Sequence, residues 1–93
     1  MNKVEVIRKA IYTYGEDAQL WMVIEEMNEL SKEICKYKRG KGKEANMTDE
    51  IADVLIMIEQ LVIICGISIE SINEQIDFKI RRLEERLNER SNT

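Results

Sequence analysis

Two short acidic motifs contain the residues of this sequence that are best suited to chemistry. Residues 25–30 read Glu-Glu-Met-Asn-Glu-Leu, and residues 49–54 read Asp-Glu-Ile-Ala-Asp-Val. Each motif holds two carboxylates three residues apart, a spacing that puts both side chains on one face of a helix, about a turn apart. The four carboxylates with this spacing are Glu26, Glu29, Glu50 and Asp53. Brought together, they would offer hard oxygen ligands that suit Mg²⁺, with Mn²⁺ as a substitute.

Each acidic pair also has a simpler interpretation. A single pair is more often a solvated helix face, and Asp49 and Glu50 would suit the first turn of a helix, where the helix dipole favours negative charge. The metal-site interpretation is stronger when both pairs are considered together, because each lies beside an apolar seam on one of two consecutive helices. The connector between these helices reverses the chain, so the two helices are expected to pack antiparallel. Four carboxylates that converge without a cation repel one another and take up protons, so convergence would imply a bound metal.

Other metal centres fit this sequence poorly. The chain has no histidine, whereas a di-iron helical bundle needs a Glu-x-x-His pair on two helices. No run of alternating acidic ligands closes with a glutamate at the twelfth position, which excludes an EF-hand. Cys35 and Cys65 are widely spaced, so we expect two small buried hydrophobic residues in a reducing compartment, rather than a disulfide or a zinc site.

Composition predicts an all-α protein. The 93 residues include no proline and four glycines, so long helices meet few breaks. We expect a single domain over residues 1–93, with four helices packed antiparallel. A chain of this length buries a modest fraction of its surface, and we therefore expect oligomerisation to complete the fold.

Charge and hydropathy narrow the expected partners. The net charge is −4 and the isoelectric point is near 4.9, which argues against nucleic acid because phosphate backbones select basic surfaces. The first ten residues mix charged and apolar side chains, unlike a signal peptide. Residues 54–65 form the longest apolar run, but Glu59 and Gln60 interrupt it and it is too short to cross a membrane. We expect a soluble, cytoplasmic protein.

Periodicity predicts helices at residues 3–14, 16–38, about 48–65 and about 69–89. Gly15 and Gly66 mark breaks between them, and residues 39–46 form a basic connector with two glycines. We expect Asn46 or Thr48 to cap the third helix and Ser68 to cap the fourth.

Each of the three longer helices has a predicted apolar face. The second carries a seam that leaves Glu26 at the edge of the core, formed by Leu20, Val23, Met27, Leu30, Ile34 and Tyr37. The third is apolar nearly all round, so we expect it to be central and partly covered by another subunit. It is expected to bury Ile51, Val54, Leu55, Ile58, Leu61, Val62 and Cys65. The seam of the fourth comprises Ile69, Ile72, Ile76, Ile80, Leu83 and Leu87.

The acidic motifs resemble the signature of the MazG-type all-α nucleoside triphosphate pyrophosphohydrolases. That signature is Glu-Glu-x-x-Glu, a spacer of variable length, and Glu-x-x-Asp. The matching residues here are Glu25, Glu26, Glu29, Glu50 and Asp53. The resemblance covers residues 16–88 and implies a four-helix architecture, with dimers and tetramers both known in the family.

The resemblance implies cleavage of a nucleoside triphosphate between the α and β phosphates, giving the monophosphate and pyrophosphate. Mg²⁺ would neutralise the triphosphate and help to orient the attacking water, and the residues carried over as its ligands are Glu26, Glu29, Glu50 and Asp53. Glu25 would hydrogen-bond a metal-bound water or act as general base, and a solvated carboxylate is the equally weighted alternative. A house-cleaning role in the nucleotide pool would fit such an activity.

Further substrate contacts are less sharply indicated. Lys79 and Arg82, on one flank of the seam of the fourth helix, are candidates for phosphate binding, and the resemblance supports basic residues in this region. Solvated helix charges are the equally weighted alternative. Trp21 would stack on a base, although a tryptophan of the core or of a subunit interface is the simpler interpretation. No feature selects the base. The competing hypothesis is a non-enzymatic helical oligomer that acts as an adaptor or regulatory subunit.

Overall fold

The computed structural model describes residues 1–91 and contains four α-helices. These are α1 (Lys3–Tyr14), α2 (Glu16–Lys38), α3 (Glu44–Cys65) and α4 (Ile69–Ser91). No strand occurs in this range, which confirms the predicted all-α, four-helix class. The bounds of α1 and α2 match the prediction because Gly15, at φ 92°, adopts a conformation that side chains disfavour and so separates the two helices.

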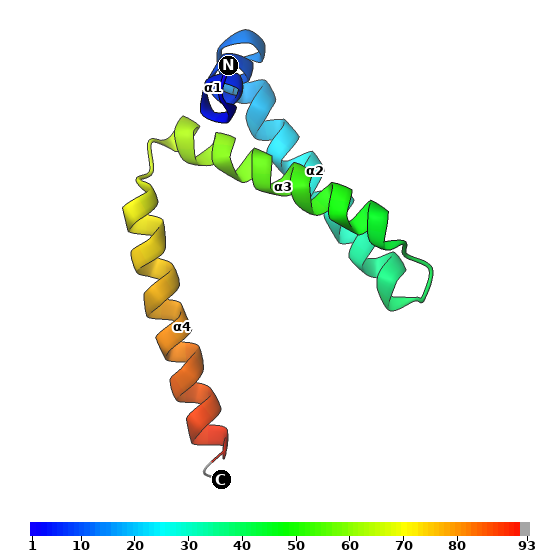
Figure 1. Ribbon diagram of the computed structural model, residues 1–93, viewed down its shortest axis with the longest axis vertical. Coiled ribbons are helices and arrows are strands. Elements are labelled where there is room, and N and C mark those ends of the chain that lie inside the picture. Colours follow the sequence, from blue (N-terminus) through cyan, green and yellow to red (C-terminus); the bar gives the residue numbers. More distant parts are fainter. Residues whose placement is uncertain (92–93) are drawn as a thin grey trace.

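Helices α2 and α3 form an antiparallel hairpin, and α1 packs across the end where α2 begins and α3 ends (Figure 1). The connector at the other end is tight. The Gly40 N–H donates to the Tyr37 carbonyl at 2.9 Å, and Gly40 has φ 74°. A side chain at Gly42 would lie 3.0 Å from the Tyr37 backbone. The two glycines therefore let the chain reverse within a few residues.

Helix α3 begins earlier than predicted. It starts at Glu44 after an extended Lys43, and the Thr48 hydroxyl donates to the Glu44 carbonyl at 2.9 Å within the helix. The predicted caps at Asn46 and Thr48 are therefore wrong. Glu44 and Ala45 are good helix formers, and a glutamate suits the first turn electrostatically. Glu50 consequently lies beyond the first turn, where a helix-start role does not explain it.

The inner face of the hairpin differs from the predicted seams. Val23 and Met57 are buried between the helices, at 4% and 6% exposure, together with Val54. Several residues predicted to be buried are instead exposed in the single chain, namely Met27, Ile34, Tyr37, Ile51, Leu55 and Ile58. Polar residues take their place on the inner face, and those that are buried are Gln19, Glu33 and Gln60. Apolar periodicity cannot detect a face built in this way.

Helix α4 does not join this packing. It extends away from the hairpin after Gly66, which ends α3 with a left-handed φ of 65° (Figure 1). The backbone N–H of Ser71 donates to Ser68 Oγ at 3.1 Å, which confirms the predicted cap. Ile72 is the half-buried residue of α4, and the rest of its seam is exposed. The radius of gyration is accordingly 17.1 Å, against about 12 Å for a compact domain of this length.

The outward faces of α2 and α3 also expose both cysteines, which are free thiols. The prediction that Cys35 and Cys65 are buried is therefore wrong for the single chain, because no element of residues 1–91 covers these faces. Within the same residues no single helix is both long and apolar enough to cross a bilayer. Only α3 and α4 combined satisfy length and composition, as a pair bent by 118°.

Candidate metal centre

Three of the four predicted metal ligands converge across the hairpin. Glu26 comes from α2, and Glu50 and Asp53 come from neighbouring turns of α3. One carboxylate oxygen of each residue lies within 4.8 Å of the others, and all three side chains are half-buried. The antiparallel hairpin produces this arrangement, because it places the acidic turn of α2 against the acidic turns of α3.

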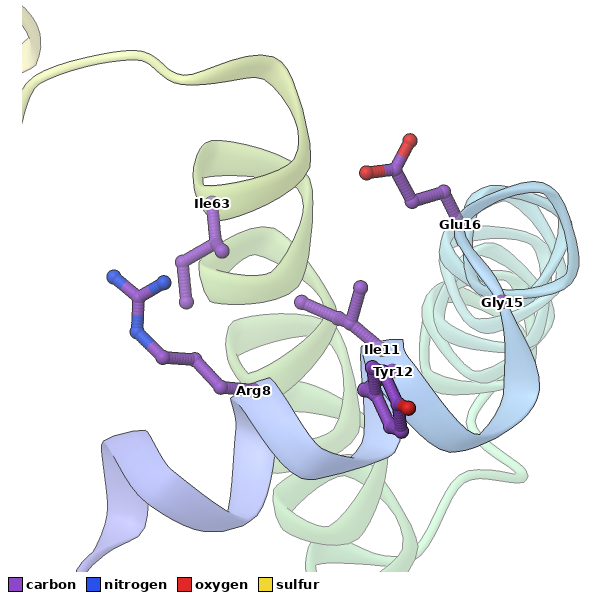
Figure 2. A pocket seen from close by; sticks show the side chains of 6 residues that line it. All are labelled: Arg8, Ile11, Tyr12, Gly15, Glu16 and Ile63. Carbon is purple, nitrogen blue, oxygen red and sulfur yellow. The ribbon is translucent and has the colours of Figure 1, made fainter.

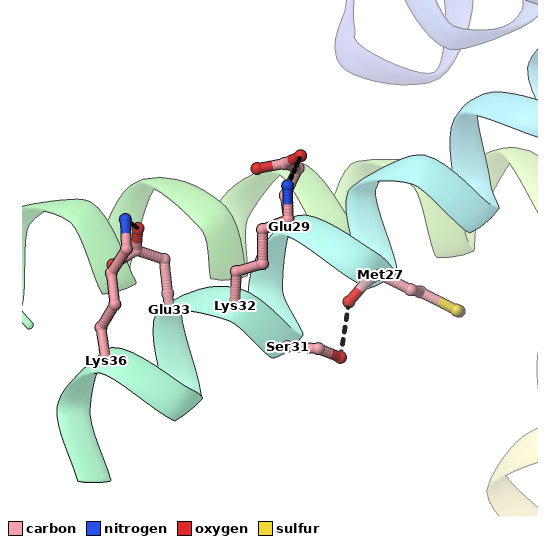
Figure 3. A network of polar contacts seen from close by, with 6 residues as sticks. All are labelled: Met27, Glu29, Ser31, Lys32, Glu33 and Lys36. Carbon is pink, nitrogen blue, oxygen red and sulfur yellow. Dashed lines mark hydrogen bonds and ion pairs between the residues drawn. The ribbon is translucent and has the colours of Figure 1, made fainter. Parts of the chain in front are cut away.

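The fourth predicted ligand, Glu29, lies at the margin of this cluster. Its side chain is exposed, and Lys32 Nζ lies 3.4 Å from its Oε1 (Figure 3). Its negative charge nonetheless contributes to the raised pKa values of both Glu26 and Glu50. Glu29 is therefore near enough to act on the cluster electrostatically, while its role as a ligand stays a prediction.

The cluster is electrostatically strained. Desolvation is the main cause of the raised pKa of Glu26, and the charges of Asp53 and Glu50 raise it further. Desolvation likewise raises the pKa of Glu50, with Asp53 as the strongest neighbouring charge. Both causes disfavour the ionised form of the carboxylates. A positive charge bound among Glu26, Glu50 and Asp53 would favour the ionised form and so lower these pKa values.

The residues present fit a divalent cation. Glu50 Oε2 is buried, and no hydrogen-bond donor of residues 1–91 reaches it. A buried carboxylate oxygen without a partner is costly, and a cation bound by the cluster supplies that partner. Two oxygens on opposite sides of one Mg²⁺ lie about 4 Å apart, so the observed spacing needs only small side-chain adjustments.

Comparison with known proteins agrees with this chemistry. The family model described as the MazG nucleotide pyrophosphohydrolase domain matches residues 15–91. The chain belongs to the MazG family. No curated protein and no solved structure matches the chain. Because the match spans α2 to α4, it includes every carboxylate of the cluster.

Other residues of the MazG signature and its surroundings lie outside the cluster. Glu25 is exposed on α2 next to Glu26, and Trp21, one turn earlier, is 60% exposed. Lys79 and Arg82 lie on α4, which leads away from the hairpin, so one chain alone does not bring them to the carboxylates (Figure 1). The Arg82 guanidinium instead lies 5.8 Å from the centre of the Phe78 ring. Their roles in substrate binding stay predictions.

Glu33 is a buried carboxylate that lies outside the MazG motif and was not predicted from the sequence. It follows Glu26 by seven residues, or two helical turns, and so lies on the same face of α2. Lys36 Nζ lies 3.2 Å from Glu33 Oε1 (Figure 3), while Oε2 is buried and has no donor within residues 1–91. The spacing of seven is the signal that could have identified it.

A hollow of about 490 Å³ lies at the end of the hairpin that α1 covers (Figure 2). Arg8 and Glu16 bring opposite charges to its walls. The full lining consists of Arg8, Ile11, Tyr12, Gly15, Glu16 and Ile63. None of the clustered carboxylates takes part, so this hollow is separate from the candidate metal centre of the MazG domain.

The raised pKa values predict how stability depends on pH when no divalent cation is present. Above the ordinary pKa of 4.5, and up to the raised values, the folded chain holds more protons than the unfolded chain, so stability falls as the pH rises. In a chelating buffer, we expect the Tm of the wild type to fall from pH 4.5 to pH 7. Glu50→Gln should flatten this decline and be the more stable protein at pH 7.

The matched control is Glu85→Gln, at an exposed position on α4, which should melt like the wild type at each pH. Thermal unfolding followed by circular dichroism measures all three proteins. A Glu50→Gln variant less stable than the wild type at pH 7 in chelator would contradict the electrostatic account.

Proposed function

We propose that this MazG protein is a nucleoside triphosphate pyrophosphohydrolase. It cleaves a (d)NTP between the α and β phosphates and releases the monophosphate and pyrophosphate, in a house-cleaning role for the nucleotide pool. The observation that carries this proposal is the convergence of Glu26, Glu50 and Asp53 in a chain of the MazG family. The close approach of carboxylates that repel one another is explained if they bind a cation, and a triphosphate substrate requires a cation as well.

Mg²⁺, with Mn²⁺ as a substitute, is the cofactor that the carboxylate cluster would hold. Glu26, Glu50 and Asp53 would bind it directly, and Glu29 would join them by leaving its exposed ion pair with Lys32. An exposed pair of this kind contributes about 0–1 kcal/mol, so its loss is easily offset. Once bound, the ion neutralises triphosphate charge and polarises the phosphoryl oxygens.

Glu25 is the proposed proton acceptor. It is exposed and adjacent to Glu26 in sequence, so a water that approaches the cluster from solvent can hydrogen-bond to its carboxylate. In the reaction the water oxygen bonds to one of the two phosphorus atoms of the α–β anhydride, the bond from that phosphorus to the bridging oxygen breaks, and the bridging oxygen leaves on the other phosphate group. Glu25 would accept the proton that the water loses, and Trp21 on the same helix would stack on the base.

A second copy of the chain is the proposed partner for α4. The seam of α4 and the outer apolar residues of α2 and α3 are exposed together in one chain. The flank of that seam carries Lys79, Arg82 and Arg86, whereas the hairpin carries an acidic cluster, so the two surfaces complement each other in charge. Docking of α4 on a neighbouring hairpin would cover both and bring Lys79 and Arg82 toward triphosphate charge, in a dimer or a tetramer.

Activity tests the proposed reaction. We expect release of pyrophosphate from at least one member of a panel of canonical and modified NTPs and dNTPs, only when Mg²⁺ or Mn²⁺ is present. Glu26→Gln and Asp53→Asn each remove a charged ligand, so each should reduce kcat/KM by at least about 100-fold. Glu16→Gln, in the exposed first turn of α2, is the control. Inactivity of the wild type across the panel would favour the adaptor hypothesis.

The proposed partner for α4 is tested by molar mass. We expect Leu83→Glu, which places a charge on the exposed seam of α4, to convert the oligomer to monomers, as measured by size exclusion with light scattering. The control is Asn88→Glu, which adds the same charge away from the seam and should leave the mass unchanged. A monomeric wild type, or equal effects of both variants, would refute this interface.

A further inference from the structure

A hollow of about 380 Å³ lies between the end of α1 and the first turns of α2. Its lining consists of Tyr14, Ala18, Gln19 and Met22. The tyrosine hydroxyl and the glutamine amide are the polar groups of these side chains, and the rest of the wall is apolar. A site for a small flat molecule is typically built in this way, with apolar walls for contact area and a few polar groups for orientation. Because alanine has a small side chain, Ala18 leaves the hollow open.

Gln19 is the polar residue best suited to recognise a ligand in this hollow. The residue is 5% exposed, and its backbone N–H donates to the Gly15 carbonyl at 3.1 Å, which fixes its position. Its amide side chain forms no hydrogen bond within residues 1–91. A buried amide without a partner is unfavourable, but it offers a ligand one acceptor and two donors. The edge of a nucleobase carries donors and acceptors side by side, which an amide can pair with.

The hollow lies on the same side of α2 as the MazG signature. A stripe of residues at spacings of four, three and four connects the two, and it consists of Ala18, Met22, Glu25 and Glu29. Met22 and Gln19 precede Glu26 by four and seven residues, which corresponds to about 6 Å and about 10 Å along the helix axis. The sugar and base of a nucleotide can span this distance when its α and β phosphates lie at the carboxylates. The larger hollow of Figure 2 contains no residue of the stripe.

Aromatic side chains are available on this side of the molecule. Tyr14 lines the hollow and is 69% exposed, so its ring can contact a ligand. Stacking on such a ring is open to every base, because each base has a π face. Trp21 follows Ala18 by three residues and is therefore its neighbour on the surface of α2. The stacking role proposed for Trp21 is thus compatible with a base held here.

We propose that the hollow lined by Tyr14, Ala18, Gln19 and Met22 holds the nucleobase of the substrate. The Tyr14 ring stacks on the base, and the Gln19 amide hydrogen-bonds to its edge and selects among bases. This inference rests on the proposed function and deepens it, because it assigns the base of the triphosphate to residues outside the MazG signature.

Binding of α,β-methylene dNTPs tests this site without relying on catalysis. In these analogues a CH₂ group replaces the bridging oxygen, so they are not cleaved. Isothermal titration calorimetry with Mg²⁺ measures the Kd of analogues that carry adenine, cytosine, guanine, thymine or uracil. Inorganic tripolyphosphate, which has no base, is measured in the same way. We expect the wild type to bind at least one analogue more tightly than tripolyphosphate by at least about fivefold, the contribution of stacking on one aromatic ring.

Two variants at exposed positions change the hollow itself. Ala18→Leu fills the hollow and should abolish the advantage of the analogue while leaving the Kd of tripolyphosphate unchanged. Its control is Ala45→Leu, the same change at an exposed position near the start of α3. Tyr14→Ala should weaken binding of the analogue by at least about fivefold. Its control is Tyr12→Ala, at a 90% exposed position on the same helix.

Gln19→Met tests the recognition of the base edge. The variant keeps the length of the side chain but removes its donors and acceptor, so the preference for the best base over the others should fall by about tenfold. Circular dichroism establishes that the variant is folded. If it is not, Ala18→Leu and Tyr14→Ala decide the matter.

The outcomes separate the base site from the proposed reaction. Equal affinity of the wild type for tripolyphosphate and every analogue would overturn the base site and leave the reaction and the metal centre standing. An affinity for the best analogue that Ala18→Leu leaves unchanged would have the same meaning. No binding of any triphosphate in Mg²⁺ would contradict the proposed function itself, and the base site with it.

Discussion

Repulsion among half-buried carboxylates at the α2–α3 interface is the constraint on which the rest of the structure depends. Glu26, Glu50 and Asp53 meet where a hairpin of this kind would normally bury apolar side chains. The apolar contacts that oppose this repulsion are few, with Val23, Val54 and Met57 as the buried members. The hairpin is thus a poor interface for two helices alone and a good one for two helices with a cation between them.

The same constraint accounts for the shape of the single chain. Since polar residues occupy much of the inner face, many large apolar side chains of α2 and α3 lie outside it, and α4 leaves its own seam exposed. A chain with so small a core gains little stability from folding alone. In the proposed assembly, the outer faces are the second interface of each hairpin, and the basic flank of α4 supplies charge that the acidic cluster lacks.

Much of this could be predicted from the sequence, and the failures have physical causes. Glycine breaks and long periodic segments located α1 and α2 to the residue. The three-residue spacing of carboxylates indicated four side chains that would converge, and three of them do, whereas Glu29 lies at the margin of the cluster. The rotation of α2 was mispredicted because Met27 and Ile34 are as apolar as core residues although they are exposed. Periodicity locates an apolar face but does not show whether that face is the inner one. Glu33 was missed because the motif ends at Glu29. The direction of α4 was not predicted, because the break at Gly66 marks where α3 ends without fixing the angle at which the next helix leaves.

The most direct test of the central claim is the effect of Mg²⁺ on thermal unfolding at neutral pH. Preferential binding to the folded hairpin should raise the Tm of the wild type, with a gain of about 2.7 kcal/mol when Mg²⁺ is at 100 times its Kd. The gain should largely disappear in the double variant of Glu26→Gln and Asp53→Asn, which is already relieved of repulsion. No Mg²⁺-dependent shift in the wild type, or an equal shift in the double variant, would contradict the claim that a cation resolves this cluster.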